Sequence, residues 1–129
     1  MGSIRVGMNT EWVQVSLPYK LNSGIYKFYI ETETTLFNWD ISTSNDGVNW
    51  TTVYSYTNYI KQLKTFRDDF LILQDDVYTI RINIKDSLEF TNKIKEITFY
   101  QVVYNGDLKR IYPNFTTSSQ NITSPSSLS

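Results

Sequence analysis

The side chains best suited to acid–base chemistry in this sequence are two adjacent carboxylate pairs, Asp68-Asp69 and Asp75-Asp76. The chain contains no histidine and no cysteine, which excludes an imidazole base, an imidazole metal ligand and a thiolate nucleophile. Consecutive residues of a strand point to opposite faces, so neither pair converges on one substrate atom. We interpret both pairs as solvated loop charges and expect no enzymatic activity.

A cluster of tyrosines and amides is the strongest signal for binding. Tyr54, Tyr56 and Tyr59 lie close together in the chain, with Asn58 among them. Tyrosine offers a flat contact area and a hydroxyl at a low entropic cost, which suits the recognition of both carbohydrates and proteins. These four residues are therefore candidate ligand-binding residues. The alternative is that the rings cover one end of the hydrophobic core.

The three tryptophans also suit stacking on sugar rings, but their positions favour other roles. Trp39 shares its alternation with Phe37 and Ile41, which predicts a place in the core. Trp50 follows a turn, and we expect it in the core as well. Trp12 falls opposite the apolar face of its strand, so an exposed or interface position is equally compatible with the pattern.

Composition and charge exclude several classes of partner. The net charge is −1 and the sequence pI is about 5.3, and basic residues form no cluster larger than a pair. An electrostatic footprint for nucleic acid or for an anionic bilayer is therefore missing. The sequence has no apolar run near the length of a membrane span and no pattern of a signal peptide, so membrane insertion is not expected.

Alternating apolar and polar residues, with no alanine anywhere in the chain, predict an all-β fold. The expected strands cover residues 11–17, 26–31, 36–44, 48–54, 77–84 and 93–103. Pro18 is expected to end the first strand, and Asn45-Asp46-Gly47 to form a tight turn. The strand at 77–84 should direct Tyr78, Ile80, Ile82 and Ile84 into the core and Arg81 outward. The predicted core residues are Phe37, Trp39, Ile41, Ile80, Ile82, Ile97 and Phe99.

Several short strands separated by turns and loops predict an antiparallel β-sandwich of the jelly-roll type. Residues 55–76 are predicted to be a long connection with one short strand near 70–73, and residues 86–92 a loop. One more short strand is expected within 108–115. Residues 1–115 are thus expected to form a single domain, and the Ser/Thr-rich residues 116–129 a flexible tail or linker. Ligand contact is expected at the end formed by 54–59 and 86–92.

Three short segments occur in a characteristic order. They are EWVQVSL at 11–17, ISTSNDGVNW at 41–50, and YTIRI at 78–82 followed by IKEITFY at 94–100. In this order they resemble the patterns W-x-Q-V-D-L, I-x-x-S-x-D-G-x-x-W, Y-V-R-I and I-x-E-I-x-x-Y of the discoidin-like domains (F5/8 type C, or family-32 carbohydrate-binding modules). The resemblance covers roughly residues 11–102 and implies a discoidin-like jelly roll.

The resemblance also implies a function and two site residues. Its members are non-catalytic modules that bind a glycan, or less often a phospholipid headgroup, through loops at one end of the barrel. Arg81 matches a family position, although an outward strand arginine is more often a cross-strand partner. Glu96 matches a glutamate that helps ligate calcium in the family, with its partner loop expected near Met8-Asn9-Thr10.

Two functions follow from these patterns. The first is a carbohydrate-binding or adhesion module, extracellular or borne on a virion. The second is a structural protein of a phage tail, baseplate or fibre that uses the same sandwich to bind other protein subunits. Only ten residues precede Glu11, fewer than in the family, and an unpaired sheet edge there would favour a homo-oligomer.

Overall fold

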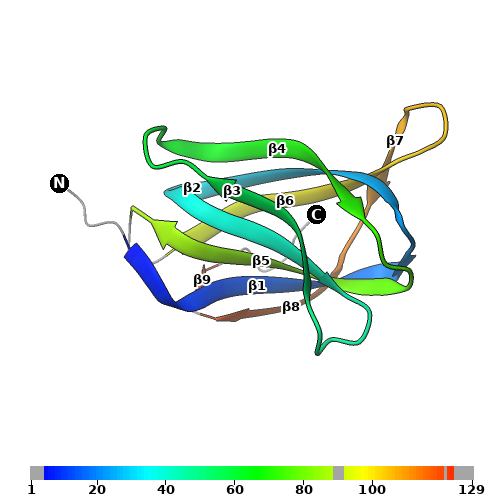
Figure 1. Cartoon of the computed structure of the whole chain (residues 1–129), viewed down its shortest axis with the longest axis horizontal. Coiled ribbons are helices and arrows are strands. Elements are labelled where there is room, and N and C mark those ends of the chain that lie inside the picture. The colour runs from blue at the N-terminus through cyan, green and yellow to red at the C-terminus, as the bar shows by residue number, and fades with distance from the viewer. Residues whose placement is uncertain (1–4, 89–91, 121, 124–129) are drawn as a thin grey trace.

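The computed structural model describes residues 5–88, 92–120 and 122–123, with side chains described over 11–88 and 92–113 (Figure 1). The described residues form strands and no helix, and all the pairings are antiparallel except that of β9 with β6. The strands are β1 (Arg5–Leu21), β2 (Gly24–Ser44), β3 (Thr51–Thr57), β4 (Leu63–Ile72), β5 (Val77–Ser87), β6 (Asn92–Val102), β7 (Leu108–Ile111), β8 (Asn114–Gln120) and β9 (Ile122–Thr123). The predicted all-β class is confirmed.

The long strand β2 organises the fold because it belongs to both layers. Its first part, up to Thr32, pairs with β4 and β6, and its later part, from Asn38, pairs with β3 and β5. The buried side chains change parity between the two parts, from Phe28 and Ile30 to Trp39 and Ile41. The register shifts between these parts, so one continuous strand turns its inner face from one layer to the other.

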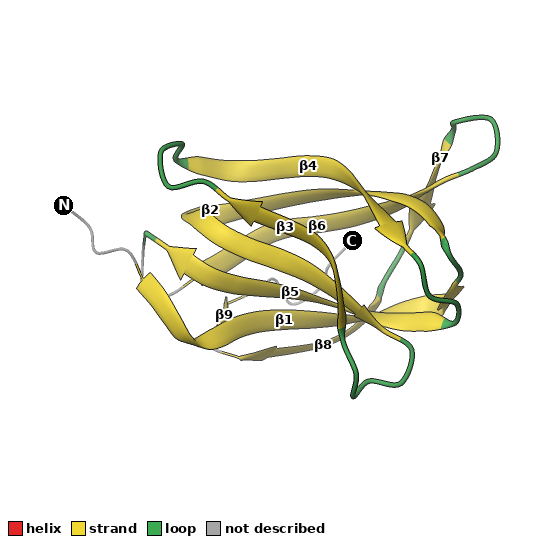
Figure 2. Cartoon of the chain, in the orientation of Figure 1, coloured by secondary structure: helices red, strands yellow, loops and turns green. Residues whose placement is uncertain are grey.

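The result is a sandwich of two sheets joined through β2 (Figures 1 and 2). We call the layer of β4, the first part of β2, β6 and β7 sheet I. Sheet II consists of β3, the later part of β2, β5, β1 and β8. The inner faces of the two sheets enclose the core, and their outer faces are available for other roles.

The core contains the residues that the alternation predicts. Phe37, Trp39, Ile41, Ile80, Ile82, Ile97 and Phe99 are all buried, and so are Val13, Val15, Leu17 and Ile84. Tyr78 is the exception, because its side chain is 38% exposed. It lies at the start of β5, where the phenol reaches over the turn at Gly47. A Cβ atom at Gly47 would lie 2.6 Å from the Tyr78 hydroxyl, and the φ of +76° there also favours glycine.

Several predicted strand boundaries are wrong. The expected strands at 26–31 and 36–44 are one continuous strand, β2. The strand expected at 48–54 is β3, which covers Thr51–Thr57. Residues 55–76 contain the ten-residue strand β4 in place of a short strand near 70–73. Phe66, Phe70 and Ile72 of β4 are buried, but Asp68 between them interrupts the apolar alternation. Its carboxylate accepts a hydrogen bond from the Tyr54 hydroxyl at 3.1 Å, which explains an acid at that position.

The first and last strands also extend beyond the sequence prediction. Pro18 does not end β1, because it falls in a register shift between the pairs Ser16–Thr79 and Leu21–Val77, where no ladder donor is needed. Within the predicted tail, β8 pairs with β1, and β9 pairs with β6. The threonines of this segment suit a strand, but its serines give no apolar alternation, so the pattern did not predict β8. Over the described residues, no helix has the length and apolarity needed to span a bilayer.

Candidate ligand-binding groove

The register of sheet I places charged and aromatic side chains in rows on its outer face. Tyr29 of β2 lies directly between Arg67 of β4 and Thr98 of β6. Because Phe28 and Ile30 point into the core, Tyr29 points outward, and so do its neighbours in the row. The Arg67 guanidinium lies over the Tyr29 ring, 5.0 Å from its centroid.

A second row crosses four strands next to the first. Lys27 of β2 lies between Asp69 of β4 and Tyr100 of β6, and Tyr100 lies opposite Arg110 of β7. Lys27 and Asp69 form an ion pair at 3.3 Å. The two rows together place two arginines and two tyrosines on one outer face.

These rows enclose an open groove of about 460 Å³. Its lining residues come from all four strands of sheet I: Lys27, Phe28, Tyr29, Arg67, Glu96, Thr98, Tyr100, Leu108 and Arg110. A groove of this kind offers flat contact area and directed hydrogen-bonding groups at the same time.

The ionisable groups around the groove have defined partners. Lys95 forms an ion pair with Glu31 at 3.1 Å and lowers the pKa of that carboxyl. The Tyr29 hydroxyl donates to Glu31 at 3.3 Å, and burial, followed by the charge of Glu31, raises the pKa of Tyr29. The phenol at the centre of the groove therefore remains neutral at ordinary pH and offers a hydroxyl rather than a charge.

Tyr54 and Tyr56 point inward from β3 and complete the core. The Tyr54 ring lies 4.7 Å from Phe28 and 5.6 Å from Trp39, between ring centroids. Burial, followed by the charge of Asp68, raises the pKa of Tyr54 to about 12. The Tyr56 ring lies edge-on to Phe66, with 4.9 Å between centroids, and its hydroxyl is buried. The structure thus places both rings over the core, which is the alternative that the sequence left open.

Asn58 and Tyr59 shape the loop that follows β3. The Asn58 side chain accepts hydrogen bonds from the backbone N–H groups of Ile60 and Lys61 at 2.9 and 3.0 Å, which fixes a turn. The Tyr59 ring stacks on Phe37, with 5.8 Å between centroids, and its hydroxyl donates to Asp86. Residues 54–59 and Asp86 therefore meet at one end of the sandwich, while residues 89–91 of the expected loop lie outside the described residues.

Arg81 lies on the outer face of sheet II, away from the tyrosines. Its guanidinium sits over the Trp12 ring and over the Trp50 ring, 4.2 Å from each centroid, and its Nε donates to Gln14 at 2.9 Å. The expectation that Trp50 is a core residue is wrong, since it is partly exposed. It precedes the first residue of β3 and so lies outside the alternation of that strand. Arg81 of β5 is thus a cross-strand partner of Gln14 of β1, which is the role that its outward position favours.

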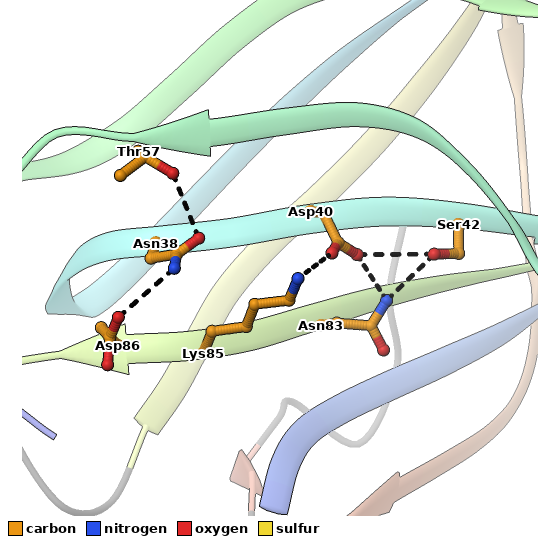
Figure 3. Close-up of polar contacts among 7 residues, drawn as sticks. All are labelled: Asn38, Asp40, Ser42, Thr57, Asn83, Lys85 and Asp86. Atoms are coloured by element: carbon orange, nitrogen blue, oxygen red, sulfur yellow. Dashed lines mark hydrogen bonds and ion pairs between the residues drawn. The ribbon is translucent and has the colours of Figure 1, made fainter. Parts of the chain in front are cut away.

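A polar network occupies the same face of sheet II, between β2 and β5 (Figure 3). The buried Asp40 carboxylate accepts a hydrogen bond from Asn83 at 2.6 Å and forms an ion pair with Lys85 at 3.0 Å. Beside them, the Asn38 amide donates to Asp86 at 3.3 Å. These contacts join β2 to β5 across the two strands. One oxygen of the Asp86 carboxylate, Oδ1, is buried and has no hydrogen-bond partner among the described residues.

The described residues do not assemble a calcium site around Glu96. Glu96 lies opposite Glu31 in the register of sheet I, whereas Met8-Asn9-Thr10 belong to β1 of sheet II, and their side chains lie outside the described part. Calcium takes about six to eight oxygen ligands. Among the described residues, no group of three or more His, Cys, Asp or Glu side chains is placed to hold a metal ion.

The groove residues other than Glu96 were missed by the sequence analysis. Their one available signal was the outward alternation of Lys27 and Tyr29 and of Thr98 and Tyr100, which also fits an ordinary solvated face. No family model matches the sequence, and neither the curated proteins nor the solved structures include a significant match. The β-sandwich architecture is therefore the level at which the structure supports the resemblance described above.

Proposed function

We propose that this chain is a non-catalytic carbohydrate-binding or adhesion module of discoidin-like type, acting outside the cell or on a virion. We further propose that the groove on sheet I is its glycan site. The observation that supports this most directly is the outward placement of Tyr29 and Tyr100 in two adjacent rows, with Arg67 beside Tyr29 and Arg110 beside Tyr100. Tyrosine rings match the apolar C–H faces of sugars, and the arginines donate to hydroxyl oxygens.

The groove favours binding over hydrolysis. Glu96 is the one carboxylate among its described lining residues. Glycoside hydrolysis ordinarily uses a pair of carboxyl groups on either side of the scissile bond. An open, shallow site also covers little of a ligand, so we expect affinities from micromolar to millimolar, about −8 to −4 kcal/mol.

A double variant of the two groove tyrosines tests the proposal. Tyr29→Ala with Tyr100→Ala should reduce glycan binding at least tenfold, measured by calorimetry with a ligand found on a broad glycan array. Tyr104→Ala is the matched control, because that ring is fully exposed and does not line the groove. Circular dichroism and the Tm should show that the fold is kept. A double variant that binds like the wild type would place the glycan elsewhere, and loss of binding in Tyr59→Ala alone would point to the loop end.

A second candidate function is protein assembly, as in a phage tail, baseplate or fibre. Ile25 and Leu71 lie directly opposite each other on the outer face of sheet I and are 48% and 54% exposed. Leu73, just beyond them, is 82% exposed. Adjacent exposed aliphatic side chains of this kind favour contact with another protein subunit.

Sedimentation distinguishes this function from the first. If the chain assembles through this surface, the wild type should sediment as an oligomer, and Leu71→Lys should shift it to the monomer. Ile60→Lys is the control, because Ile60 is also exposed but lies in the connection between β3 and β4, outside this surface. A wild type that binds no glycan on the array and sediments as an oligomer would replace the carbohydrate-binding proposal with assembly.

A further inference from the structure

We infer that the groove on sheet I selects acidic carbohydrates, with ring carboxylates held by Arg67 and Arg110. This inference rests on the proposed function and names the class of glycan that the same site would take. Three cations, Lys27, Arg67 and Arg110, and one carboxylate, Glu96, line the groove. The local charge is thus positive in a chain whose net charge is −1.

The two arginines differ from the neighbouring lysines in their partners. Ion pairs on this side of the molecule join Lys27 to Asp69, Lys95 to Glu31 and Lys93 to Glu33. Over the described residues, neither Arg67 nor Arg110 forms an ion pair with a carboxylate. The lysines are neutralised from within the chain, whereas the charges of both groove arginines remain to be neutralised by a ligand.

Both guanidinium groups are instead held by aromatic rings. Arg67 lies over Tyr29 at 5.0 Å, and Arg110 lies over Tyr112 at 4.8 Å from the ring centroid. Stacking uses the flat face of a guanidinium and leaves its N–H edge free. That edge is a rigid fork whose geometry matches the two oxygens of a carboxylate. The rings therefore orient both arginines for an anion without satisfying their donors.

Arg110 has an unpartnered hydrogen-bond donor and also lines the groove. Its Nε is buried and has no hydrogen-bond partner among the described residues. A buried donor without a partner is costly and uncommon in folded proteins. A ligand carboxylate at the edge of the Arg110 guanidinium would supply the acceptor.

The positions of the two arginines match an oligosaccharide rather than a small anion. Arg67 is on β4 and Arg110 is on β7, with β2 and β6 between them. Three strand spacings and an offset of two residues along the strands separate their backbones by about 16 Å. Tyr29 and Tyr100 lie between the arginines, where they can stack on sugar rings, and Glu96 can accept hydrogen bonds from sugar hydroxyls. The face therefore combines anion binding at its two sides with sugar contact in the middle.

A matched pair of ligands tests the inference. A uronic-acid oligosaccharide and the same oligosaccharide with its carboxyl groups reduced to alcohols differ only in their charge. The acidic form should bind the wild type at least tenfold more tightly, measured by calorimetry at low salt. Arg67→Gln and Arg110→Gln should each remove most of that preference, because the affinity for the acidic form falls much further than the affinity for the neutral form. Lys64→Gln removes a charge from β4 outside the groove lining and should change neither affinity.

The outcomes separate the inference from the proposed function. Equal affinity for the acidic and neutral forms would overturn the inference and leave the carbohydrate-binding proposal standing. Binding of neither form, nor of any glycan on an array, would overturn both. Full retention of acidic binding in Arg67→Lys and Arg110→Lys would exclude the forked carboxylate contact, because lysine keeps the charge without the fork. A single-stranded oligonucleotide that competes as well as the acidic sugar would show a general polyanion site instead.

Discussion

Phe28 and Trp39 lie on the same strand, β2, and yet pack edge to face across the interior of the sandwich, with 5.5 Å between their ring centroids. Each ring is fully buried. This contact is available only because β2 leaves one sheet and enters the other between the two residues. The aromatic pair therefore connects the sheet with the candidate groove to the sheet with the Arg81 stack.

Replacement of Trp39 should be strongly destabilising. Trp39→Ala removes the contacts with Phe28, Tyr54, Tyr56 and Phe66 and leaves a cavity between the sheets. We expect the free energy of unfolding to fall by about 3–5 kcal/mol, measured by urea denaturation. Trp50→Ala is the matched control and should cost about 1–2 kcal/mol, since it loses a cation–π contact at a partly exposed site. Equal losses in the two variants would contradict the placement of Trp39 at the centre of the core.

The sequence predicts the fold wherever strand alternation is regular. Val13 and Val15, Ile80 and Ile82 were assigned correctly because each inward residue is apolar. Prediction failed where tertiary contacts favour a polar residue at a position that the alternation reserves for an apolar one. Asp68 interrupts β4 to bind the Tyr54 hydroxyl. Buried polar residues near the middle of β2, such as Thr34, conceal the continuity of that strand.

The candidate groove could not be predicted from the sequence, for a different reason. Its rows depend on which strands are neighbours and on their register, as when Lys27 lies opposite both Asp69 and Tyr100. Alternation fixes which face a residue occupies, but it does not identify the strand beside it. The sequence singled out the tyrosines of β3 because they are close together in the chain, whereas the groove is assembled from four separate strands.

The Arg81 stack should contribute measurably to stability. Arg81→Ala removes the guanidinium from between Trp12 and Trp50 and leaves Gln14 without its donor. We expect a loss of about 1–3 kcal/mol in the free energy of unfolding. Arg81→Lys keeps the charge but not the planar group, so it should recover less than half of that loss. A lysine variant as stable as the wild type would show that the stack contributes little beyond its charge.

The turn at Asp46 should make stability depend on acid pH. The Asp46 carboxylate accepts hydrogen bonds from the backbone N–H groups of Asn49 and Val48 at 2.7 and 2.8 Å, and these bonds hold its pKa well below the ordinary value. A lowered pKa in the folded state stabilises the protein above the unfolded pKa, about 3.9, and this contribution is lost as the pH falls further. Asp46→Asn should therefore destabilise the protein at pH 7, and its difference from the wild type should shrink steadily as the pH falls from about 4 to 2 in denaturation experiments. A stability difference that is constant with pH would contradict this assignment.

The contact between Tyr54 and Asp68 should give stability an alkaline limit. Burial, followed by the charge of Asp68, raises the pKa of Tyr54 to about 12, while the unfolded phenol titrates near its ordinary value of about 10. The pKa of Tyr54 is higher in the folded state than in the unfolded state. The contribution of this phenol to the free energy of unfolding is therefore fully present below about pH 10 and is lost as the pH rises toward 12.

Tyr54→Phe should accordingly flatten the decline of stability over that alkaline range, measured by denaturation at a series of pH values, and should remove a late step from the tyrosinate absorbance titration. Tyr104→Phe is the control, because the exposed Tyr104 should titrate normally and leave the alkaline decline unchanged. Asp68→Asn removes the charge but not the burial, which is the larger cause, so Tyr54 should still titrate later than an exposed tyrosine. An alkaline decline that is the same in the wild type and in Tyr54→Phe would mean that the ring is solvated and does not pack between Phe28 and Asp68.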